Sequence, residues 1–127
     1  MNAIIKKIED ESFLINPKNK PLMIEDLDIL GIKKDSLFYE LYTTYFSFAI
    51  GNGAELFSLE QLMEYNNPEL AHIIFASDDG GTLIYNKETD EVFEYNGVFS
   101  SNEDFGLTQY ENSWETFDLF LNHYYEN

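Results

Sequence analysis

The chain has 127 residues, 44% of them hydrophobic and 17% aromatic, enough to bury one core of ordinary size and too many for a disordered chain. It contains no cysteine, which excludes disulfides, thiolate catalysis and zinc–thiolate sites. The formal net charge of −17 arises entirely from residues 35–127, which carry eighteen acidic residues and one lysine. Residues 1–34 carry six acidic residues and six lysines, and the chain has no arginine. We therefore expect a single domain, residues 1–127, that repels nucleic acid and anionic membranes.

So one-sided a charge repels itself in the folded state, which favours a binding role over solubility, the simplest alternative. Dense carboxylates attract a basic protein, or imitate nucleic acid toward a protein that binds it. The apolar run within residues 1–8 is too short for a signal peptide, and no stretch approaches the ~20 apolar residues of a membrane span. The sequence thus predicts a cytoplasmic protein with a protein partner.

Three helices are expected in the first 50 residues. Apolar residues at helical spacing predict short helices near residues 2–8 and 21–30, and Gly31 ends the second of these in the C′ position. The clearest helix begins at Asp35 or Ser36 and ends at the Gly-Asn-Gly of residues 51–53. Its apolar residues form two adjacent rows, Leu37, Leu41 and Tyr45, and Phe38, Tyr42 and Phe46. So wide a stripe predicts a central core helix.

The middle of the chain changes to strand periodicity. A short strand is expected at residues 55–57, and Ser58 with Gln61 forms a capping box for a short helix ending near Tyr65. Three strands joined by tight turns then predict an antiparallel meander, at residues 71–76, 82–85 and 91–95. On the last strand, alternation assigns Val92 and Glu94 to one face and Glu91, Phe93 and Tyr95 to the other.

A polar loop at residues 100–111 is expected to precede a final helix. Asn112 with Glu115 resembles a capping box, and an apolar face follows at helical spacing, consisting of Trp114, Phe117, Leu121 and Tyr124. Trp114 is therefore predicted to lie in the core. Helices, then a sheet, then a helix predict the α+β class: an antiparallel sheet packed by N-terminal helices and a C-terminal helix.

No catalytic or metal constellation is expected. His72 and His123 are far apart in sequence, and Asp78-Asp79 before two glycines reads as a solvated turn, with a metal or acid–base pair as the alternative. Residues 86–90 alternate oxygen ligands but lack the glycine and terminal glutamate of a calcium loop. Neither glycine pair fits a phosphate-binding motif. The sequence predicts a protein that is not an enzyme and needs no cofactor or metal.

The order of these segments resembles the SUKH superfamily, the Smi/Knr-type domain. The resemblance covers the chain from about Ile24 onward. Its motifs are Leu30-Gly31-Ile32, the aromatic helix ending in Gly51-Asn52-Gly53, the element from Leu59 to Tyr65, Ile73-Ile74-Phe75-Ala76-Ser77, Asp79-Gly80-Gly81, Thr82-Leu83-Ile84-Tyr85, Glu91-Val92-Phe93-Glu94-Tyr95 and Ser113-Trp114-Glu115-Thr116-Phe117. One departure is Lys33-Lys34-Asp35, where the family usually has Leu-Pro.

The resemblance implies a bacterial immunity protein, which binds and neutralises a cognate toxin domain, often a basic nuclease, without catalytic residues. The alternatives are a regulatory scaffold, a DNA mimic that binds a basic host protein, and, last, a carboxylate hydrolase at Asp78-Asp79. The predicted contacts comprise acidic residues and two aromatic anchors: Glu60, Glu64, Asp78, Asp79, Glu88, Glu91 and Glu94, with Tyr85 and Tyr95.

Overall fold

An antiparallel sheet organises the chain in the computed structural model, which describes residues 21–44, 49–50, 54–78, 81–97, 99, 101–103 and 110–125. Within these residues the sheet has six strands in the order β1-β2-β3-β4-β5-β6, so each strand pairs with its neighbour in sequence. The elements are α2 (Pro21–Ile29), α3 (Leu37–Thr44), β1 (Ala49–Ile50), β2 (Ala54–Leu56), α4 (Leu59–Tyr65), β3 (His72–Asp78), β4 (Gly81–Asn86), β5 (Val92–Asn96), β6 (Tyr110–Trp114) and α5 (Phe117–Tyr125). The predicted α+β class and the three-strand meander are confirmed, and the helix expected near residues 2–8 lies outside the described residues.

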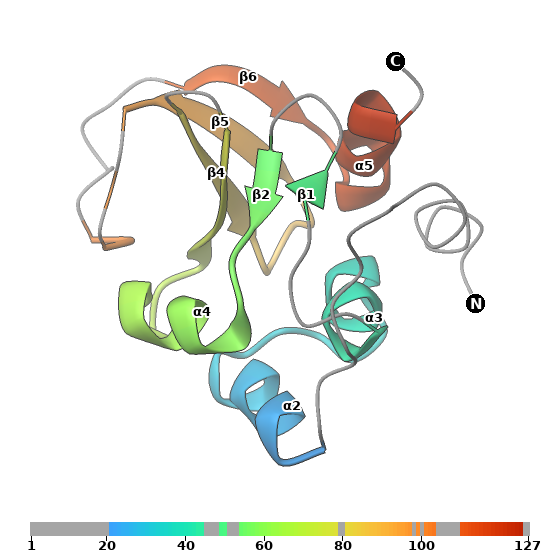
Figure 1. Ribbon diagram of the computed structural model, residues 1–127, viewed down its shortest axis with the longest axis vertical. Helices are drawn as coiled ribbons and strands as arrows, with labels where there is room; N and C mark the ends of the chain where they lie inside the picture. Colours follow the sequence, from blue (N-terminus) through green and yellow to red (C-terminus); the bar gives the residue numbers. More distant parts are fainter. Residues whose placement is uncertain are drawn as a thin grey trace.

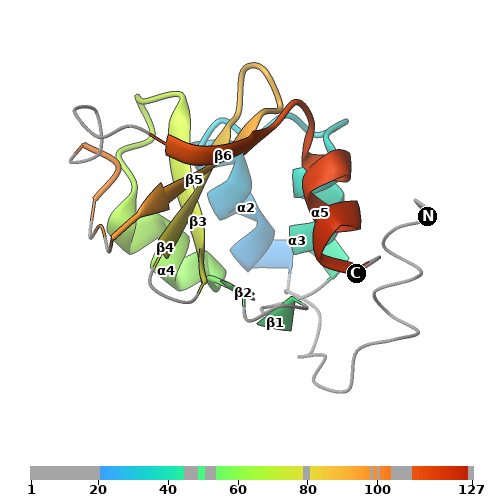
Figure 2. The same cartoon turned by 90° about the horizontal axis from the view of Figure 1, so that it is seen from above.

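The helices α2, α3 and α5 lie on one side of the sheet, as Figure 2 shows. Along β4, Leu83 and Tyr85 join the core beneath these helices, whereas Ile84 joins a second cluster on the opposite side. We call that opposite side the outer face. The alternation on β5 is confirmed, because Val92 packs in the main core and Phe93 and Tyr95 belong to the outer cluster.

The aromatic helix α3 supplies the centre of the core, as its two rows of apolar residues predict. Phe38 stacks on Tyr85 with ring centroids 4.3 Å apart and meets Phe75 edge-on at 5.5 Å. The buried hydroxyl of Tyr42 donates to the carbonyl oxygens of Phe57 (2.8 Å) and Phe75 (3.3 Å), so this polar group is satisfied. Each such side chain contributes about 1.5–3 kcal/mol by its burial. Tyr45 and Phe46 lie outside the described residues.

Helix α2 ends at Gly31, as predicted. The Ile32 N–H donates to the Leu27 carbonyl (3.0 Å) and the Gly31 N–H donates to the Asp28 carbonyl (3.1 Å), the two bonds of a Schellman motif. Gly31 has φ +80°, a conformation that other residues adopt only with strain. The chain then turns back toward α3, whose N-cap is Ser36: its Oγ accepts the Tyr39 N–H at 3.1 Å.

The capping box of α4 is also confirmed. Ser58 Oγ accepts the Gln61 N–H (3.2 Å), and Gln61 Oε1 accepts the Ser58 N–H (2.9 Å). After α4, the side-chain amides of two buried asparagines hydrogen-bond main-chain groups of β3, as a neighbouring strand would. Asn66 bonds both the N–H and the carbonyl of Ile74, at 2.8 and 2.9 Å, and Asn102 Nδ2 donates to the His72 carbonyl at 2.8 Å. These amides continue the hydrogen bonding along the edge of β3 past the end of the short β2, and they attach α4 to the sheet.

Two predicted boundaries are wrong. Ala49–Ile50 is a strand paired with β2 and does not continue the aromatic helix, which ends at Thr44. Tyr110–Trp114 is the edge strand β6 rather than a loop and helix cap, and α5 begins at Phe117. Trp114 is half-buried on β6, where its ring meets Phe120 at 5.2 Å, so it does not lead the apolar face of a helix. Tertiary pairing with β5 overrides the local resemblance to a cap.

Candidate partner-binding surface

The turn between β4 and β5, residues 86–91, is held by side-chain hydrogen bonds as well as by the main-chain hydrogen bonds between the two strands. Asn86 Oδ1 accepts the N–H groups of Glu88 (2.9 Å) and Thr89 (3.2 Å), an Asx turn. The Asp90 N–H donates to the Asn86 carbonyl at 2.8 Å, and Asp90 has φ +71°. Aspartate tolerates this left-handed conformation better than most residues, which explains its position at the end of the turn.

The Asp90 carboxylate joins the turn to two other parts of the molecule. Its Oδ1 accepts the hydroxyl of Tyr85 at 2.6 Å, and its Oδ2 accepts the N–H of Phe117, the first residue of α5, at 3.3 Å. Burial, and then the hydrogen bond and charge of Asp90, raise the pKa of Tyr85 above its ordinary value. Tyr85 is only 1% exposed, so its predicted role as a surface anchor is wrong. The ring packs on Phe38 because β4 directs it toward the helices.

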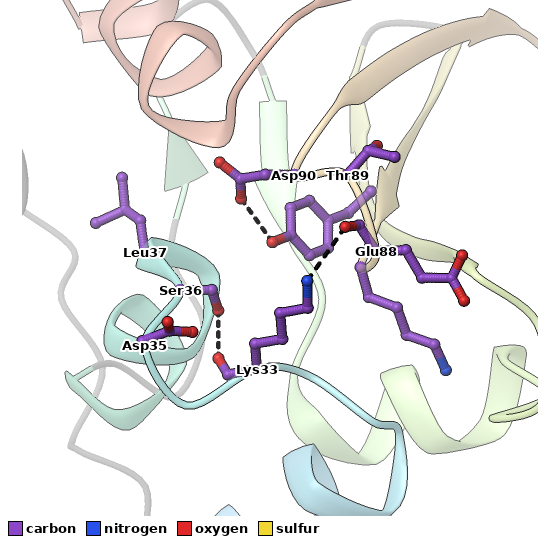
Figure 3. Close-up of a pocket in the computed structure, with 9 residues that line it drawn as sticks. Lys33, Asp35, Ser36, Leu37, Glu88, Thr89 and Asp90 are labelled. Atoms are coloured by element: carbon purple, nitrogen blue, oxygen red, sulfur yellow. Dashed lines mark hydrogen bonds between the residues drawn. The ribbon is translucent and has the colours of Figure 1, made fainter.

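Two lysines hold the same corner from the other side. Lys87 Nζ donates to the carbonyl oxygens of Leu30 (2.7 Å) and Pro68 (2.6 Å), which joins the end of α2 to the loop before β3. Burial lowers the pKa of Lys87, and the nearby Glu88 opposes that shift. Lys33 Nζ donates to the Glu88 carbonyl at 3.2 Å (Figure 3). Both ammonium groups therefore bond to main-chain oxygens.

A cavity of about 280 Å³ opens between the start of α3 and this turn (Figure 3). Its lining is polar and includes both signs of charge, with Lys33, Asp35, Ser36, Leu37, Tyr85, Lys87, Glu88, Thr89 and Asp90. Most of the polar groups already have partners within the fold: Ser36 Oγ donates to the Lys33 carbonyl at 2.6 Å, and Asp90 bonds Tyr85 and α5. These contacts stabilise a corner of the fold.

The turn brings Glu88 and Glu91 within electrostatic range of His72. Both carboxylates raise the pKa of His72, but burial outweighs them and lowers it below its ordinary value. Glu88 is exposed and Glu91 is partly exposed, with Oε1 accepting the Thr89 hydroxyl at 2.8 Å. Two of the predicted contact residues are thus brought together, and a histidine that was not among them joins them.

Aromatic rings continue from this acidic corner across the outer face. His72, Phe93 and Tyr110 form what we call the aromatic row, with centroid separations of 6.0 Å from His72 to Phe93 and 5.1 Å from Phe93 to Tyr110. Tyr110 is 53% exposed and Phe93 is partly exposed. Tyr95, the second predicted anchor, is 8% exposed and packs into the outer cluster with Ile74 and Ile84, so that prediction is wrong too.

Glu94 lies on the other face of β5. It pairs with Leu83, a residue of the main core, and its Oε1 accepts the Asn112 side chain at 2.6 Å. Residues opposite each other on neighbouring strands share a face, so Glu94 is separated from Glu91 by the thickness of the sheet. The predicted grouping of Glu88, Glu91 and Glu94 therefore divides between two faces.

The remaining predicted contacts lie in two further places. Glu60 and Glu64 are exposed on α4, one helical turn apart. Asp78 pairs with Gly81 at the end of β3 opposite to His72, roughly 20 Å away at ~3.3 Å per strand residue. Asp79 lies outside the described residues. Asp78 therefore lies at the end of β3 that is farther from the β4–β5 turn.

Strand β6 was not predicted from the sequence, and it adds a surface of its own. Four of its residues are exposed, namely Tyr110, Glu111, Asn112 and Ser113. Because both sides of the strand reach solvent, it lacks the apolar alternation that identifies a half-buried strand. A tyrosine followed by a run of polar residues was the one available signal in the sequence.

No protein-family model and no curated protein matches the chain. The described residues contain no helix long and apolar enough to cross a membrane. They also contain no group of three or more histidine, aspartate or glutamate side chains placed to hold a metal ion. The structure defines a single-domain α+β protein.

Proposed function

We propose that this chain is an immunity-type inhibitor: a non-catalytic protein that binds a basic toxin domain and blocks its active site or substrate groove. The observation that carries the proposal is the concentration of negative charge in residues 35–127. Residues 35–127 hold eighteen acidic residues and one lysine, and that lysine, Lys87, bonds to two main-chain carbonyl oxygens. A field of this sign attracts a basic protein and accelerates its association.

The acidic corner and the aromatic row have the composition of a protein interface. Aromatic residues are enriched at the centre of interfaces, and charged residues at the rim. Here the aromatic row is bordered by Glu88 and Glu91 at one end and by Glu111 next to Tyr110. An arginine or lysine of the partner can lie over an aromatic ring and reach a carboxylate, which combines cation–π and ionic attraction.

A non-catalytic role is supported by the hydrogen bonds that engage most of the polar groups lining the cavity between α3 and the β4–β5 turn. The ammonium groups bond to carbonyl oxygens, and the Asp90 carboxylate bonds Tyr85 and α5. A group that performs acid–base work has to reach a substrate proton. Binding by a surface needs no such group.

The test is neutralisation of a candidate toxin. Where a gene adjacent to that of this chain encodes a toxin domain, that domain is expressed from an inducible promoter, and growth is measured with and without co-expression of the chain. We expect growth to be restored and the purified proteins to form a complex. A toxin that kills equally in both cells, with no complex between the purified proteins, overturns the proposal.

The docking surface is tested by paired charge reversals. Glu88→Lys with Glu91→Lys alters the acidic corner, and Glu60→Lys with Glu64→Lys changes the net charge equally on α4. We expect the first pair to slow association at low salt by roughly ten- to a hundredfold, and the second pair to slow it much less. Stopped-flow measurements across a salt series distinguish the two, with circular dichroism to verify folding. Equal losses would indicate attraction by net charge without a defined surface.

A further inference from the structure

Strand β6 is the last strand of the sheet among the described residues, and it lies along the upper margin in Figure 1 and in front of the other strands in Figure 2. An edge strand presents main-chain N–H and C=O groups to solvent, where another strand can pair with them. The opposite edge is formed by β1, which has only two residues, whereas β6 has five. If a strand adds to this sheet, β6 is the edge long enough to hold it.

The hydrogen bonds between the strands show which main-chain groups of β6 point away from the sheet. The N–H of Asn86 donates to the carbonyl of Glu91 at 2.8 Å, so the main-chain groups of Glu91 point toward β4. Successive residues of an antiparallel strand direct these groups to alternate neighbours. Those of Val92 and Glu94 therefore point toward β6.

The register carries this alternation across to β6. Val92 pairs with Trp114 and Glu94 pairs with Asn112, so the main-chain groups of these two β6 residues point back to β5. Ser113, between them, directs its N–H and its carbonyl away from the sheet. Ser113 is exposed, so both groups reach solvent at the middle of the strand.

The charges of β6 favour one kind of occupant. Glu111 lies within the strand and Glu115 directly follows it, and both are exposed. In an antiparallel pairing of two copies centred on Ser113, Glu111 of one copy would oppose Glu115 of the other. Like charges at opposed positions destabilise a strand pair, so the edge resists self-association. A strand with lysine or arginine at those positions is attracted by the same carboxylates.

The exposed aromatic residue of β6 indicates that this edge does more than prevent pairing with another strand. Tyr110 is 53% exposed at the start of β6 and touches Phe93 on the outer face. An edge designed only to prevent pairing would carry charge there instead of an apolar ring. Added strands obtain affinity from main-chain hydrogen bonds and specificity from side-chain contacts, and Tyr110 provides such a contact.

We propose that β6 accepts an extended, lysine- or arginine-bearing segment of the partner protein as an additional strand, hydrogen-bonded to Ser113. This inference rests on the proposed function for the identity of the partner, and it adds the mode of binding. The acidic corner then attracts the partner, and the strand edge fixes its register. The chain would recognise a basic segment in extended conformation rather than a basic helix.

The first test uses a synthetic probe and the full chain. An acetylated, amidated octapeptide alternating lysine and valine is titrated into isotopically labelled protein, and amide shifts and hydrogen exchange are followed by NMR. We expect a downfield shift and at least about fivefold slower exchange of the Ser113 amide, because a new main-chain bond forms there. Two control peptides should leave Ser113 unchanged: one with glutamate in place of lysine, and one N-methylated at every second residue. An unchanged Ser113 with the lysine peptide overturns strand addition.

The second test uses variants of the edge. Ser113→Pro removes the outward N–H without removing a bond to β5, and proline is tolerated on edge strands. Ser113→Ala keeps the N–H and serves as the matched control. We expect Ser113→Pro to weaken binding of the lysine peptide about tenfold and Ser113→Ala to leave it unchanged. Should the proline variant not fold, Glu111→Lys replaces it, and repulsion of the lysine peptide is then the expected result.

The outcomes separate this inference from the proposed function. A toxin neutralised equally by wild type and Ser113→Pro, together with a peptide that leaves Ser113 unprotected, refutes strand addition and leaves the inhibitor role standing. A peptide that protects Ser113, in a chain that neutralises no toxin, supports the basic-strand edge and removes the toxin as its partner.

Discussion

The hydroxyl of Tyr85 and the carboxylate of Asp90 form a 2.6 Å hydrogen bond that connects the core to the β4–β5 turn. The other oxygen of Asp90 bonds the first N–H of α5, so one carboxylate orders a strand, a turn and a helix. The turn also brings Glu88 and Glu91 within electrostatic range of His72. The acidic corner is therefore joined to the core and to α5 through Asp90.

Tyr85→Phe tests that support. The substitution keeps the stacked ring and removes only the hydroxyl, so we expect a loss of about 1.5–3 kcal/mol of unfolding free energy, typical of a hydrogen bond to a charged group. Urea denaturation measures it. Tyr39→Phe, which removes a hydroxyl from a partly exposed tyrosine on α3, is the control. If both variants lose the same small amount of unfolding free energy, the bond to Asp90 does not stabilise the fold.

The conformation of Asp90 is tested separately by Asp90→Ala and Asp90→Gly. Both remove the carboxylate and its two hydrogen bonds, but only alanine is strained at φ +71°. We expect the alanine variant to be less stable than the glycine variant by roughly 1 kcal/mol. Equal stabilities would mean that the turn relaxes to another conformation once the carboxylate is removed.

Much of this fold is predictable where local signals and tertiary contacts agree. The apolar rows of α3, the capping box of α4 and the glycine after α2 each have a local physical cause, and each is present. Strand β6 was not predicted because Asn112 and Glu115 have the spacing of a helix cap. Only the pairing with β5 distinguishes a strand from a capped helix at this position. Pairing partners are far apart in sequence and leave no local pattern.

The candidate surface was harder to predict because burial and facing depend on tertiary structure. Tyr85 and Tyr95 satisfy every composition rule for interface anchors, yet both point into apolar clusters. Alternation on β5 correctly separated Glu94 from Glu91, but the choice of contact residues did not use it. His72 lies at this surface because of the register in which β3 pairs with β4, and that register is defined only in the folded sheet.

Lys87→Met should destabilise the protein by about 1.5–3 kcal/mol, because the ammonium group bonds the carbonyl oxygens of Leu30 and Pro68. Lys34→Met, at an exposed position, removes the same charge and is the matched control. Both variants increase the net negative charge equally, so the difference between them isolates the two hydrogen bonds. Thermal unfolding at moderate salt provides the measurement, and equal melting temperatures would show that only charge is at stake.

Added salt should stabilise the wild-type protein. Its carboxylates repel one another, and the ammonium groups of Lys33 and Lys87 are bonded to carbonyl oxygens. At ~0.5 M sodium chloride the Debye length shortens to roughly 4 Å, which screens that repulsion. We expect the melting temperature to rise between ~0.02 M and ~0.5 M salt. A flat or falling curve would indicate that the charges are well separated.

Trp114→Ala should cost less than the removal of a fully buried tryptophan. The ring meets Phe120 at 5.2 Å and His123 at 5.4 Å, but it is only partly buried at the end of the edge strand. We expect a loss of about 1–3 kcal/mol, below the 3–5 kcal/mol typical of a large aromatic residue in a closed core. Phe120→Ala, at a buried position of the same cluster, is the comparison and should lose more. A Trp114 variant that loses as much would mean that β6 depends on this ring for its pairing.

His72 should make the protein less stable as the pH falls below neutrality. Burial lowers its pKa in the folded state despite the nearby Glu91 and Glu88, so the unfolded chain binds the proton more readily. This contribution is complete above the unfolded pKa of ~6.5 and is lost as the pH falls through that value toward the lower folded pKa. Replacing His72 with glutamine removes the titration and keeps a polar side chain of similar size. The unfolding free energy of wild type minus that of the variant, measured by urea denaturation from pH 8 to pH 5, should therefore decrease as the pH is lowered, and the subtraction removes the titration of the carboxylates common to both proteins. A difference that increases on acidification would show that attraction to Glu91 and Glu88 outweighs burial, and that the acidic corner stabilises a charged histidine.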